Sequence, residues 1–340
     1  MSDFLHAGQI TDAKQALDRL RANMRVTIKG KDDVIEQVLT CLVAGGHLLI
    51  EDLPGVGKTT LAYSLARSMD CAFSRIQFTS DLLPSDVTGV AIYDETTREF
   101  VFKKGPVFAN VVLADEINRA TPKTQSALLE VMDRARVTVD GEPHAVGAPF
   151  MVFATQNPVD YEGTFPLPES QMDRFLMRLR LGYLSAGDET DMLRRRVSRG
   201  TEYATLTPVT DARGLLAMRD SVERIEISDD LLDYVTAIVL ATRADPQIQV
   251  GASPRGGLAL VQLARGQALL HERDYVIPDD IKQVAVPALA HRITLRPELW
   301  VRQVSADDIV SRLLNGVPTP RTDPRAARGA VPAGARPAAG

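Results

Sequence analysis

The stretch HLLIEDLPGVGKTTL, residues 47–61, decides the fold. The apolar run from Leu48 to Ile50 predicts a strand that is covered on both faces, as in a parallel sheet. A tight glycine loop follows, and a helical pattern begins near Lys58. A strand, a glycine loop and a helix in this order are typical of a phosphate-binding loop, because the N–H groups of the loop and of the helix N-terminus face an anion.

This loop departs from the usual pattern G-x-x-x-x-G-K-[ST] at one position, where Asp52 stands in place of the first glycine. Lys58 can still reach the β- and γ-phosphates of a nucleoside triphosphate, and the Thr59 hydroxyl can bind Mg²⁺. The predicted nucleotide-binding residues are Pro54, Gly55, Val56, Gly57, Lys58, Thr59 and Thr60. An ordinary glycine turn followed by an exposed lysine is the alternative.

Length and composition bound the class of protein. The chain has 340 residues, of which 45% are hydrophobic, so we expect two domains with a sizeable core. It lacks a run of about 18 uncharged apolar residues and the pattern of a signal peptide, so we expect a cytoplasmic protein without membrane insertion. Cys41 and Cys71 lack metal-ligand spacing and are expected to be reduced core residues in helices. A net charge of −5 disfavours a general nucleic-acid binder.

The amino-terminal segment, residues 1–24, is predicted to form a helix, because apolar residues recur at helical spacing. These residues are Ala13, Ala16, Leu17, Leu20 and Met24. An extended segment is expected over residues 26–31, and Asp32 or Asp33 is expected to cap the following helix. Gly30 is a candidate for the wall of an adenine site, with plain packing as the alternative.

A second buried strand, predicted over residues 109–114, ends in Asp115 and Glu116. Parallel sheets bind ligands at the carboxyl ends of their strands, so both carboxylates should lie near the phosphate loop. Asp115 can hold the water shell of Mg²⁺, while Glu116 faces the water that attacks the γ-phosphate. Acidic strand ends also occur as plain caps, but an apolar strand that follows a phosphate loop favours the catalytic role.

A third buried strand, predicted over residues 150–155, leads to Asn157. Its amide can donate to the γ-phosphate and accept from the attacking water. A turn asparagine before a proline is the alternative. Around these strands the sequence predicts a further strand over 73–78, hairpins near 92–102 and 137–146, and a helix over 124–137.

An arginine is needed to balance the charge that develops on a transferring phosphoryl group, and a neighbouring subunit can supply it. Residues 166–181, expected to be helical, carry Arg174, Arg178 and Arg180. We choose Arg174 for this role and Arg178 as the second choice. Solvated arginines on a helix surface are the alternative.

The α/β domain is expected over residues 25–184, and from residue 185 the pattern becomes purely helical. Five predicted helices form a lid over residues 185–317, in which Ser228 or Asp229 caps the third helix and Pro278 opens the last. Arg255 stands near the start of a lid helix and can reach phosphate when the lid closes, with a solvated arginine as the alternative. Residues 318–340, mostly Pro, Ala, Gly and Arg, are expected to be disordered.

With these segments in this order, the chain resembles the AAA+ ATPases and, among them, the MoxR family. The resemblance covers roughly residues 5–315 and is carried by EDLPGVGKTTLA, FTSDLLPSDVTG, FKKGPVFANVVLADEINRATPKTQSALLEVM, FATQNPVDYEGTFPLPESQMDRF and GASPRG with DYVIPDDIKQVAVPALAHRI. It implies an α/β P-loop NTPase fold of the AAA+ type, in which helices flank a parallel sheet and a smaller all-α lid domain follows.

The resemblance also implies roles for single residues. Lys58 and Thr59 match Walker A, Asp115 and Glu116 match Walker B, Asn157 matches the first sensor, Arg174 the arginine finger and Arg255 the second sensor. ATP and Mg²⁺ are the implied cofactors. A homo-oligomer in the form of a hexameric ring is the implied assembly, with chaperone-like remodelling, maturation or activation of a protein substrate, often together with a partner that has a von Willebrand factor A (VWA) domain. The two hairpins would face a central pore or a partner.

Two other function classes stay open on the sequence alone. A nucleic-acid motor or loader shares the phosphate loop, the acidic pair and the ring arginine, but the predicted hairpins carry mixed charges, unlike a groove that follows a nucleic-acid strand. A nucleotide-gated scaffold with little hydrolysis is the other class, and Glu116 argues against it.

Overall fold

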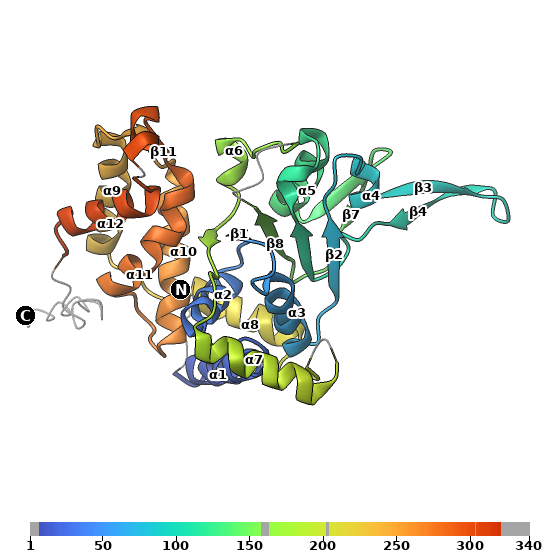
Figure 1. Ribbon diagram of the computed structural model, residues 1–340, viewed down its shortest axis with the longest axis horizontal. Helices are drawn as coiled ribbons and strands as arrows, with labels where there is room; N and C mark the ends of the chain where they lie inside the picture. Colours follow the sequence, from blue (N-terminus) through green and yellow to red (C-terminus); the bar gives the residue numbers. More distant parts are fainter. Residues whose placement is uncertain (1–6, 158–162, 202–203, 303, 321–340) are drawn as a thin grey trace, which may run out of the picture.

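The computed structural model describes residues 7–157, 163–201, 204–302 and 304–320. At its centre lies a parallel sheet with the strand order β2-β5-β8-β1-β9 (Figure 1). The strands are β1 Leu48–Glu51, β2 Phe73–Gln77, β5 Val111–Asp115, β8 Met151–Gln156 and β9 Met177–Leu179. This sheet confirms the predicted α/β class. The three strands predicted to be buried, β1, β5 and β8, are neighbours at its centre.

Alternation along the strands divides the core into two clusters. Leu48 and Ile50 of β1 belong to one cluster and Leu49 to the other, because successive side chains of a strand point to opposite faces. The first cluster lies under helices α1 Ala7–Thr27, α2 Asp32–Val43 and α3 Lys58–Ser68, and the second under α4 Pro84–Thr88 and α5 Pro122–Arg134. The sheet is therefore covered on both faces.

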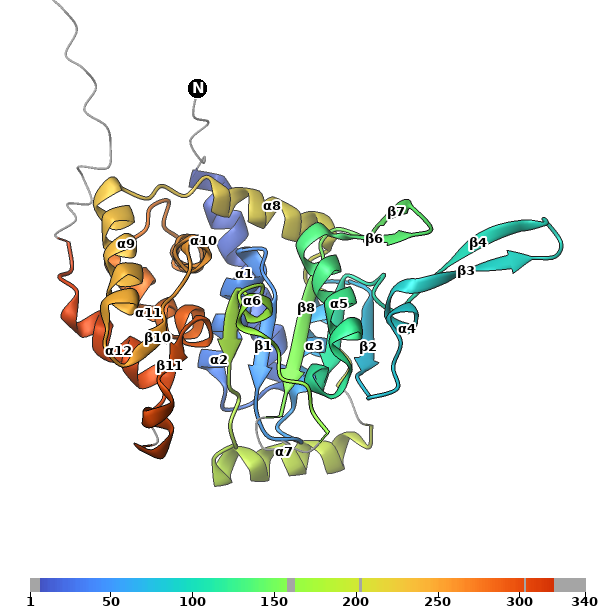
Figure 2. The ribbon, with the colours of Figure 1, turned by 90° about the horizontal axis from the view of Figure 1, so that it is seen from above.

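Two hairpins extend from the second face of the sheet. The longer one, β3 Gly89–Asp94 with β4 Glu99–Lys104, projects far from the body (Figures 1 and 2). The shorter one pairs β6 Arg136–Val139 with β7 Glu142–Ala145. Phe102 stacks on His144 with ring centroids 4.0 Å apart, so the two hairpins touch at the base of the longer one. Both were predicted from the sequence.

From residue 186 on, the described chain is largely helical. Its helices are α7 Ala186–Arg199, α8 Ala212–Glu223, α9 Asp229–Ala244, α10 Pro254–Leu270, α11 Pro278–Leu289 and α12 Ala306–Gly316. α8 packs against α1, α2 and α10, and α10 also packs against α2. The first core cluster consequently continues from the sheet into α9–α12. α7 has no buried residue and crosses below the carboxyl ends of the strands (Figure 2).

The prediction of a purely helical segment after residue 185 was wrong. Strands β10 Ile248–Val250 and β11 Thr294–Leu295 form a short antiparallel pair. The 3-10 helices η2 Ala290–Arg292 and η3 Pro297–Arg302 flank β11. Strands of two or three residues leave almost no periodic signal in a sequence, because one alternation cannot be distinguished from a loop. Helix α12 was also not predicted.

Two predictions before the phosphate loop were also wrong. Residues 26 and 27 are not extended, because α1 continues to Thr27, whose hydroxyl donates to the carbonyl of Met24 over 3.0 Å. Neither Asp32 nor Asp33 caps α2, since the cap position is Lys31 and both aspartates lie in the first turn. There their charges still favour the positive end of the helix dipole. Residues 1–6 of the predicted amino-terminal helix lie outside the described residues.

The prediction of a helix over residues 166–181 was wrong as well. Only α6 Glu169–Met172 is helical, and β9 adds a fifth strand that pairs in parallel with β1. Apolar Met177, Leu179 and Leu181 alternate with Arg178 and Arg180, so they reach the core while the arginines point away from it. This alternation is typical of a strand, but the spacing of four residues between Arg174 and Arg178 favoured the helix prediction. The 3-10 helix η1 Ile117–Arg119 completes the elements near the site.

Both cysteines are free and buried, as predicted. Cys41 lies in α2, whereas Cys71 follows the end of α3 and is not helical, contrary to the prediction. Burial raises the pKa of both thiols. Among the described helices, none combines the length and the apolar character needed to cross a bilayer. Residues 321–340 of the predicted disordered tail lie outside the described part of the chain.

Packing of α1 on the sheet domain predicts a difference between two deletions of apolar atoms. Leu20 is fully buried, so Leu20→Ala should lower the free energy of unfolding by about 2–5 kcal/mol, as large-to-small changes in cores do. Val197 of α7 is 81% exposed, and Val197→Ala should change it by less than about 0.5 kcal/mol. Urea denaturation of both variants measures this, and equal effects would contradict the packing of α1.

Candidate functional site

The phosphate loop joins the carboxyl end of β1 to the first residue of α3. Gly55 and Gly57 have φ angles of +83° and +97°, a conformation that other residues rarely adopt, and Gly57 is the N-cap of α3. Lys58 begins the helix, and its Nζ donates to the carbonyl oxygen of Asp52 over 2.8 Å. The loop therefore presents backbone N–H groups and a lysine at one edge of the sheet, as an anion site requires.

Acidic side chains surround Lys58. Burial lowers the pKa of Lys58, whereas the negative charges of Asp115, Asp52 and Glu116 act in the opposite direction. The carboxylates at the end of β5, Asp115 and Glu116, are thus close enough to Lys58 to affect its protonation. The structure brings together Lys58, Asp115 and Glu116, which are far apart in the sequence.

Asp115 is the last residue of β5 and is buried. One of its carboxylate oxygens accepts a hydrogen bond from the Thr155 hydroxyl over 2.7 Å. The other oxygen accepts from the Arg75 guanidinium, with Nη2 at 2.7 Å. Since both partners come from the neighbouring strands β8 and β2, sheet pairing fixes the direction of this carboxylate.

Glu116 follows at once in a left-handed conformation, with φ of +56°. Its N–H donates to the Thr155 hydroxyl oxygen over 2.8 Å, and its carboxylate accepts from Gln77 and pairs with Arg119, both at 3.0 Å. Only a few per cent of residues other than glycine have positive φ, and such strain often marks a functional site. The Thr155 hydroxyl thus binds the carboxylate of Asp115 and the backbone of Glu116 at the same time.

The donor set here fits a hard cation. Thr59, in the first turn of α3, offers a hydroxyl oxygen, and Asp115 offers a carboxylate. Oxygen ligands from one or two protein groups, completed by phosphates and water, are the usual environment of Mg²⁺. Among the described residues, no group of three or more His, Cys, Asp or Glu side chains could hold a metal alone.

Asn157 directly follows β8, which lies between β1 and β5 in the sheet. Its backbone therefore emerges between the phosphate loop and the acidic pair, at the same edge. Residues 158–162, which come next, lie outside the described part of the chain.

The two arginines chosen from the sequence have different surroundings. Arg174 is 28% exposed, donates to the carbonyl of Leu129 over 2.7 Å and pairs with Asp133 at 2.6 Å. It lines a shallow pocket of about 340 Å³ with residues of α5 and with Gln171. Arg178 is only 10% exposed, because Glu51 at 3.1 Å and Asp307 at 2.7 Å hold it inside the chain.

Arg255 is exposed and is the second residue of α10, as predicted. The N-cap of that helix, Ser253, donates its hydroxyl to Asp173 over 2.9 Å, and Asp173 also pairs with Arg292 at 2.8 Å. Asp173 directly precedes Arg174, so the start of α10 lies next to the Arg174 segment. Gly30 has φ of +63°, and a side chain there would collide with Asp188 at the start of α7.

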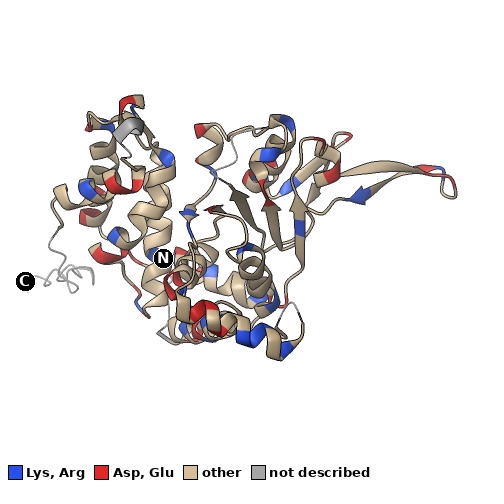
Figure 3. Ribbon diagram, in the orientation of Figure 1, with Lys and Arg blue, Asp and Glu red and all other residues tan. Residues whose placement is uncertain are grey.

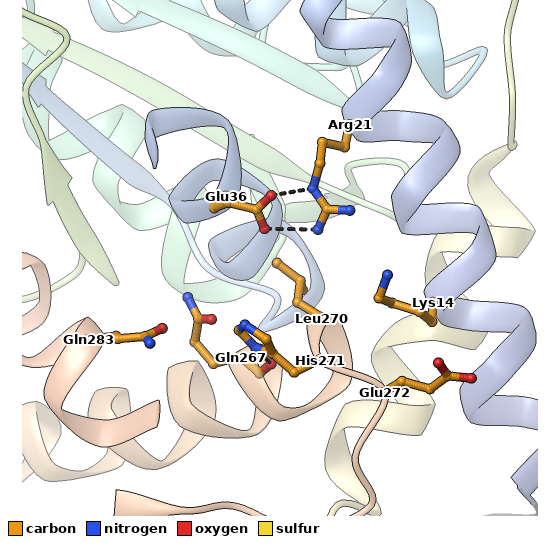
Figure 4. A pocket seen from close by; sticks show the side chains of 8 residues that line it. All are labelled: Lys14, Arg21, Glu36, Gln267, Leu270, His271, Glu272 and Gln283. Atoms are coloured by element: carbon orange, nitrogen blue, oxygen red, sulfur yellow. Dashed lines mark hydrogen bonds and ion pairs between the residues drawn. The ribbon is translucent and has the colours of Figure 1, made fainter. Parts of the chain in front are cut away.

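A separate polar pocket lies between α1, α2 and α10, with a volume of about 490 Å³ (Figure 4). Arg21 and Glu36 form an ion pair across its wall, and Lys14 pairs with Asp18. Its cations are therefore already neutralised by carboxylates. It contains none of the predicted nucleotide-binding residues.

Sequence reasoning did not find Thr155 as a part of the site. A threonine near the end of a buried strand has no distinctive pattern, and its role follows only from the order of strands, which sets β8 beside β5. Arg75 and Gln77 were missed for the same reason, since the pairing of β2 with β5 places them beside the acidic pair.

Comparison with known proteins agrees with this geometry. The ATPase family associated with various cellular activities (AAA) matches residues 47–177, and the AAA lid domain matches residues 240–313. The Bacillus subtilis protein YeaC is 49% identical over 86% of this chain and 91% of its own length. Chaperone MoxR1 of Mycobacterium tuberculosis is 39% identical over 90% of this chain and 83% of its own.

A crystal structure of a Cytophaga hutchinsonii protein described as an ATPase superposes with a TM-score of 0.86 at 37% identity, covering 92% of this chain and 98% of that one. A phosphate loop, an acidic strand end and a helical lid on a parallel sheet define an ATPase of the AAA+ class. Within that class, the chain belongs to the MoxR family.

The bridging position of Thr155 predicts a selective loss in one of two conservative variants. Thr155→Val removes the hydroxyl and leaves the Glu116 N–H and an Asp115 oxygen without this partner, which costs about 1–3 kcal/mol per buried group. We expect kcat for ATP hydrolysis to fall by about tenfold or more, since each 1.4 kcal/mol is a factor of ten. Thr155→Ser keeps the hydroxyl and should stay near the parent; similar losses in both variants would contradict the bridge.

Proposed function

We propose that the chain hydrolyses ATP with Mg²⁺ at the carboxyl edge of its sheet, in a homo-oligomeric ring that remodels or activates a protein partner. One observation carries the proposal: Lys58, Asp115 and Glu116 converge at one edge, where the Thr155 hydroxyl binds the Asp115 carboxylate and the Glu116 N–H. The bound triphosphate is placed on Pro54–Thr60 by the loop N–H groups and the α3 N-terminus. Gly30, two residues before the start of α2, is proposed as part of the adenine wall.

Each residue then has a task in phosphoryl transfer. Lys58 binds the β- and γ-phosphates, and Glu116 orients and deprotonates the attacking water. Asn157 contacts the γ-phosphate and the same water. Thr59 and Asp115 hold Mg²⁺, which neutralises charge on the phosphate oxygens when bound. In this assignment Arg75 must give up part of its hydrogen bonding to the Asp115 carboxylate when the cation binds. Its side chain is 49% exposed and can therefore move.

We propose that Arg174 completes the site of a neighbouring subunit, with Arg255 beside it. Arg174 is partly exposed next to a shallow pocket, and its partners Leu129 and Asp133 belong to α5, not to the phosphate loop. An arginine stabilises the charge of the transition state only when it reaches the phosphoryl group. A ring of subunits, hexameric by family resemblance, supplies that contact.

A protein is the partner that the surface favours. Phe100 is 74% exposed at the far end of the long hairpin, and Tyr93 packs against it. The hairpins carry both acidic and basic residues (Figure 3), and such a mixed charge does not suit a nucleic-acid groove. The relative named Chaperone MoxR1 supports a chaperone-like role. A VWA-domain partner and a cytoplasmic location complete the proposal.

Two variants separate nucleotide binding from hydrolysis. Glu116→Gln keeps the shape of the side chain but loses the base, so we expect ATP binding close to the parent and kcat at least 100-fold lower. Lys58→Ala should lose affinity for ATP, because the phosphates lose their cation. Equilibrium binding and steady-state turnover measure both. Parent-like turnover in Glu116→Gln would remove Glu116 from the mechanism. The Glu116→Gln variant with ATP bound and not hydrolysed is also suited to capture the protein partner.

Sharing of the site between subunits predicts recovery in a mixture. Arg174→Ala and Lys58→Ala subunits should each be inactive alone, because one lacks the arginine and the other the phosphate-binding lysine. In mixed rings some interfaces combine an intact loop with an intact Arg174, so part of the turnover should return. Turnover is measured against the mixing ratio, and activity that stays absent at every ratio would contradict a shared site.

A further inference from the structure

Asp52 occupies the position at which the phosphate-loop pattern has glycine. The backbone does not require glycine here, since Asp52 is not among the described residues with positive φ. Its side chain is nearly buried, with 8% of the residue exposed. A buried carboxylate needs hydrogen-bond donors, and the identity of these donors shows what the residue does.

Backbone N–H groups of three other residues bind this carboxylate. Oδ1 accepts from Leu53 over 2.8 Å, and Oδ2 accepts from both Leu181 and Gly182 over 2.6 Å. Leu181 and Gly182 follow β9, beyond the last residue pair of the β1–β9 ladder, Ile50 and Leu179. The Asp52 carboxylate therefore continues the pairing of β1 with β9 after the backbone ladder has ended.

The main chain of Asp52 is attached to the site itself. Its carbonyl accepts from Lys58 Nζ over 2.8 Å, and its N–H donates to the carbonyl of Gln156 on β8 over 3.2 Å. An ammonium group has three donors, so Lys58 can bind phosphate and stay in contact with Asp52. A change in the position of Lys58 is then felt directly by Asp52.

The connection after β9 leads to α7 and the helices beyond it. Residues 181–185 run from the end of β9 to α7, which crosses the same edge of the sheet (Figure 2). Lys31 holds this connection from the other side, with Nζ at 2.8 Å from the carbonyl of Tyr183. Gly182, with φ of +63°, allows the turn between these two attachments.

A second attachment lies one residue earlier. Glu51 pairs with Arg178 of β9, which also pairs with Asp307 in the first turn of α12. The dipeptide Glu51-Asp52 at the base of the phosphate loop thus contacts both the connection to α7 and, through Arg178, the lid helix α12.

We propose that Asp52 is a positioning residue that couples the phosphate loop to the segment 181–185 and to the helices that follow. The inference rests on the proposed function, in which Lys58 binds the phosphates of ATP. When nucleotide binding changes the position of Lys58, Asp52 shifts with it through its carbonyl. The Asp52 carboxylate then transmits this shift to the N–H groups of Leu181 and Gly182. Asp52 contributes to turnover by placing these helices, and not by binding phosphate.

Restoration of the usual glycine is the decisive test. Asp52→Gly gives the loop its common sequence and keeps every residue assigned to phosphate, so the affinity for ATP should stay within about threefold of the parent. Without the carboxylate, kcat should fall at least tenfold at unchanged KM. Asp70→Gly serves as the control for loss of an aspartate side chain elsewhere, because Asp70 is exposed and lies outside the site, and its φ of +48° tolerates glycine.

Hydrogen exchange by mass spectrometry gives a readout that does not depend on hydrolysis. In the parent, the non-hydrolysable analogue AMP-PNP should change protection in 181–185 and α7, whereas in Asp52→Gly the 181–185 segment should exchange at least tenfold faster and no longer respond. Asp52→Asn keeps one acceptor oxygen for Leu181 and Gly182, so it should restore part of the protection and part of kcat. It also carries the test if Asp52→Gly does not fold.

Several outcomes would overturn the inference. Parent-like exchange and kcat in Asp52→Gly would show that the contact has no consequence. A loss of ATP affinity that accounts for the whole loss of turnover would place Asp52 in the binding pocket instead. If the parent hydrolyses no ATP, the proposed function fails, and the response of residues 181–185 to AMP-PNP still decides whether the coupling exists.

Discussion

Pairing of β8 with β1 on one side and with β5 on the other is the constraint on which the site depends. It places three segments at one edge of the sheet. These are the end of β1 before the phosphate loop, the end of β5 with Asp115 and Glu116, and Asn157 after β8. The two outer faces of this sheet are buried under separate helix layers, so the strands cannot slip without exposing a whole apolar face. Precision at the site is therefore a property of the core.

Strong local signals made much of this predictable. The phosphate loop and the acidic strand end are short continuous motifs, and the buried strands are apolar runs. The residues that orient these motifs were not predictable in the same way. Thr155 and Arg75 act on Asp115 from neighbouring strands, and no local pattern states which strands are neighbours. The sequence also could not show that the Arg178 side chain, the second choice for the trans-acting arginine, is held between two carboxylates of its own chain.

Charged contacts, in addition to apolar ones, join the sheet domain to the helices at its carboxyl side. Asp173 binds both Ser253 and Arg292, and Arg178 joins Glu51 to Asp307. Removal of one partner from a buried ion pair leaves an uncompensated charge, so such contacts have strict geometric requirements. They place the start of α10 beside the Arg174 segment, and α12 beside the base of the phosphate loop. The Arg174 segment and the phosphate loop are thus both attached to the helices of the carboxyl-terminal part of the chain.

The left-handed backbone at Glu116 has an evolutionary consequence. A non-glycine residue in this region costs of order 1 kcal/mol or more, and glycine or asparagine would adopt it with less strain. The contacts of the Glu116 carboxylate with Gln77 and Arg119 offset part of this cost. To the extent that they do not, selection for thermal robustness alone favours replacement of this glutamate, and selection for turnover opposes it. A library screened solely for heat resistance should therefore accumulate inactive proteins through changes at this one position, so stability and catalysis compete here within a single residue.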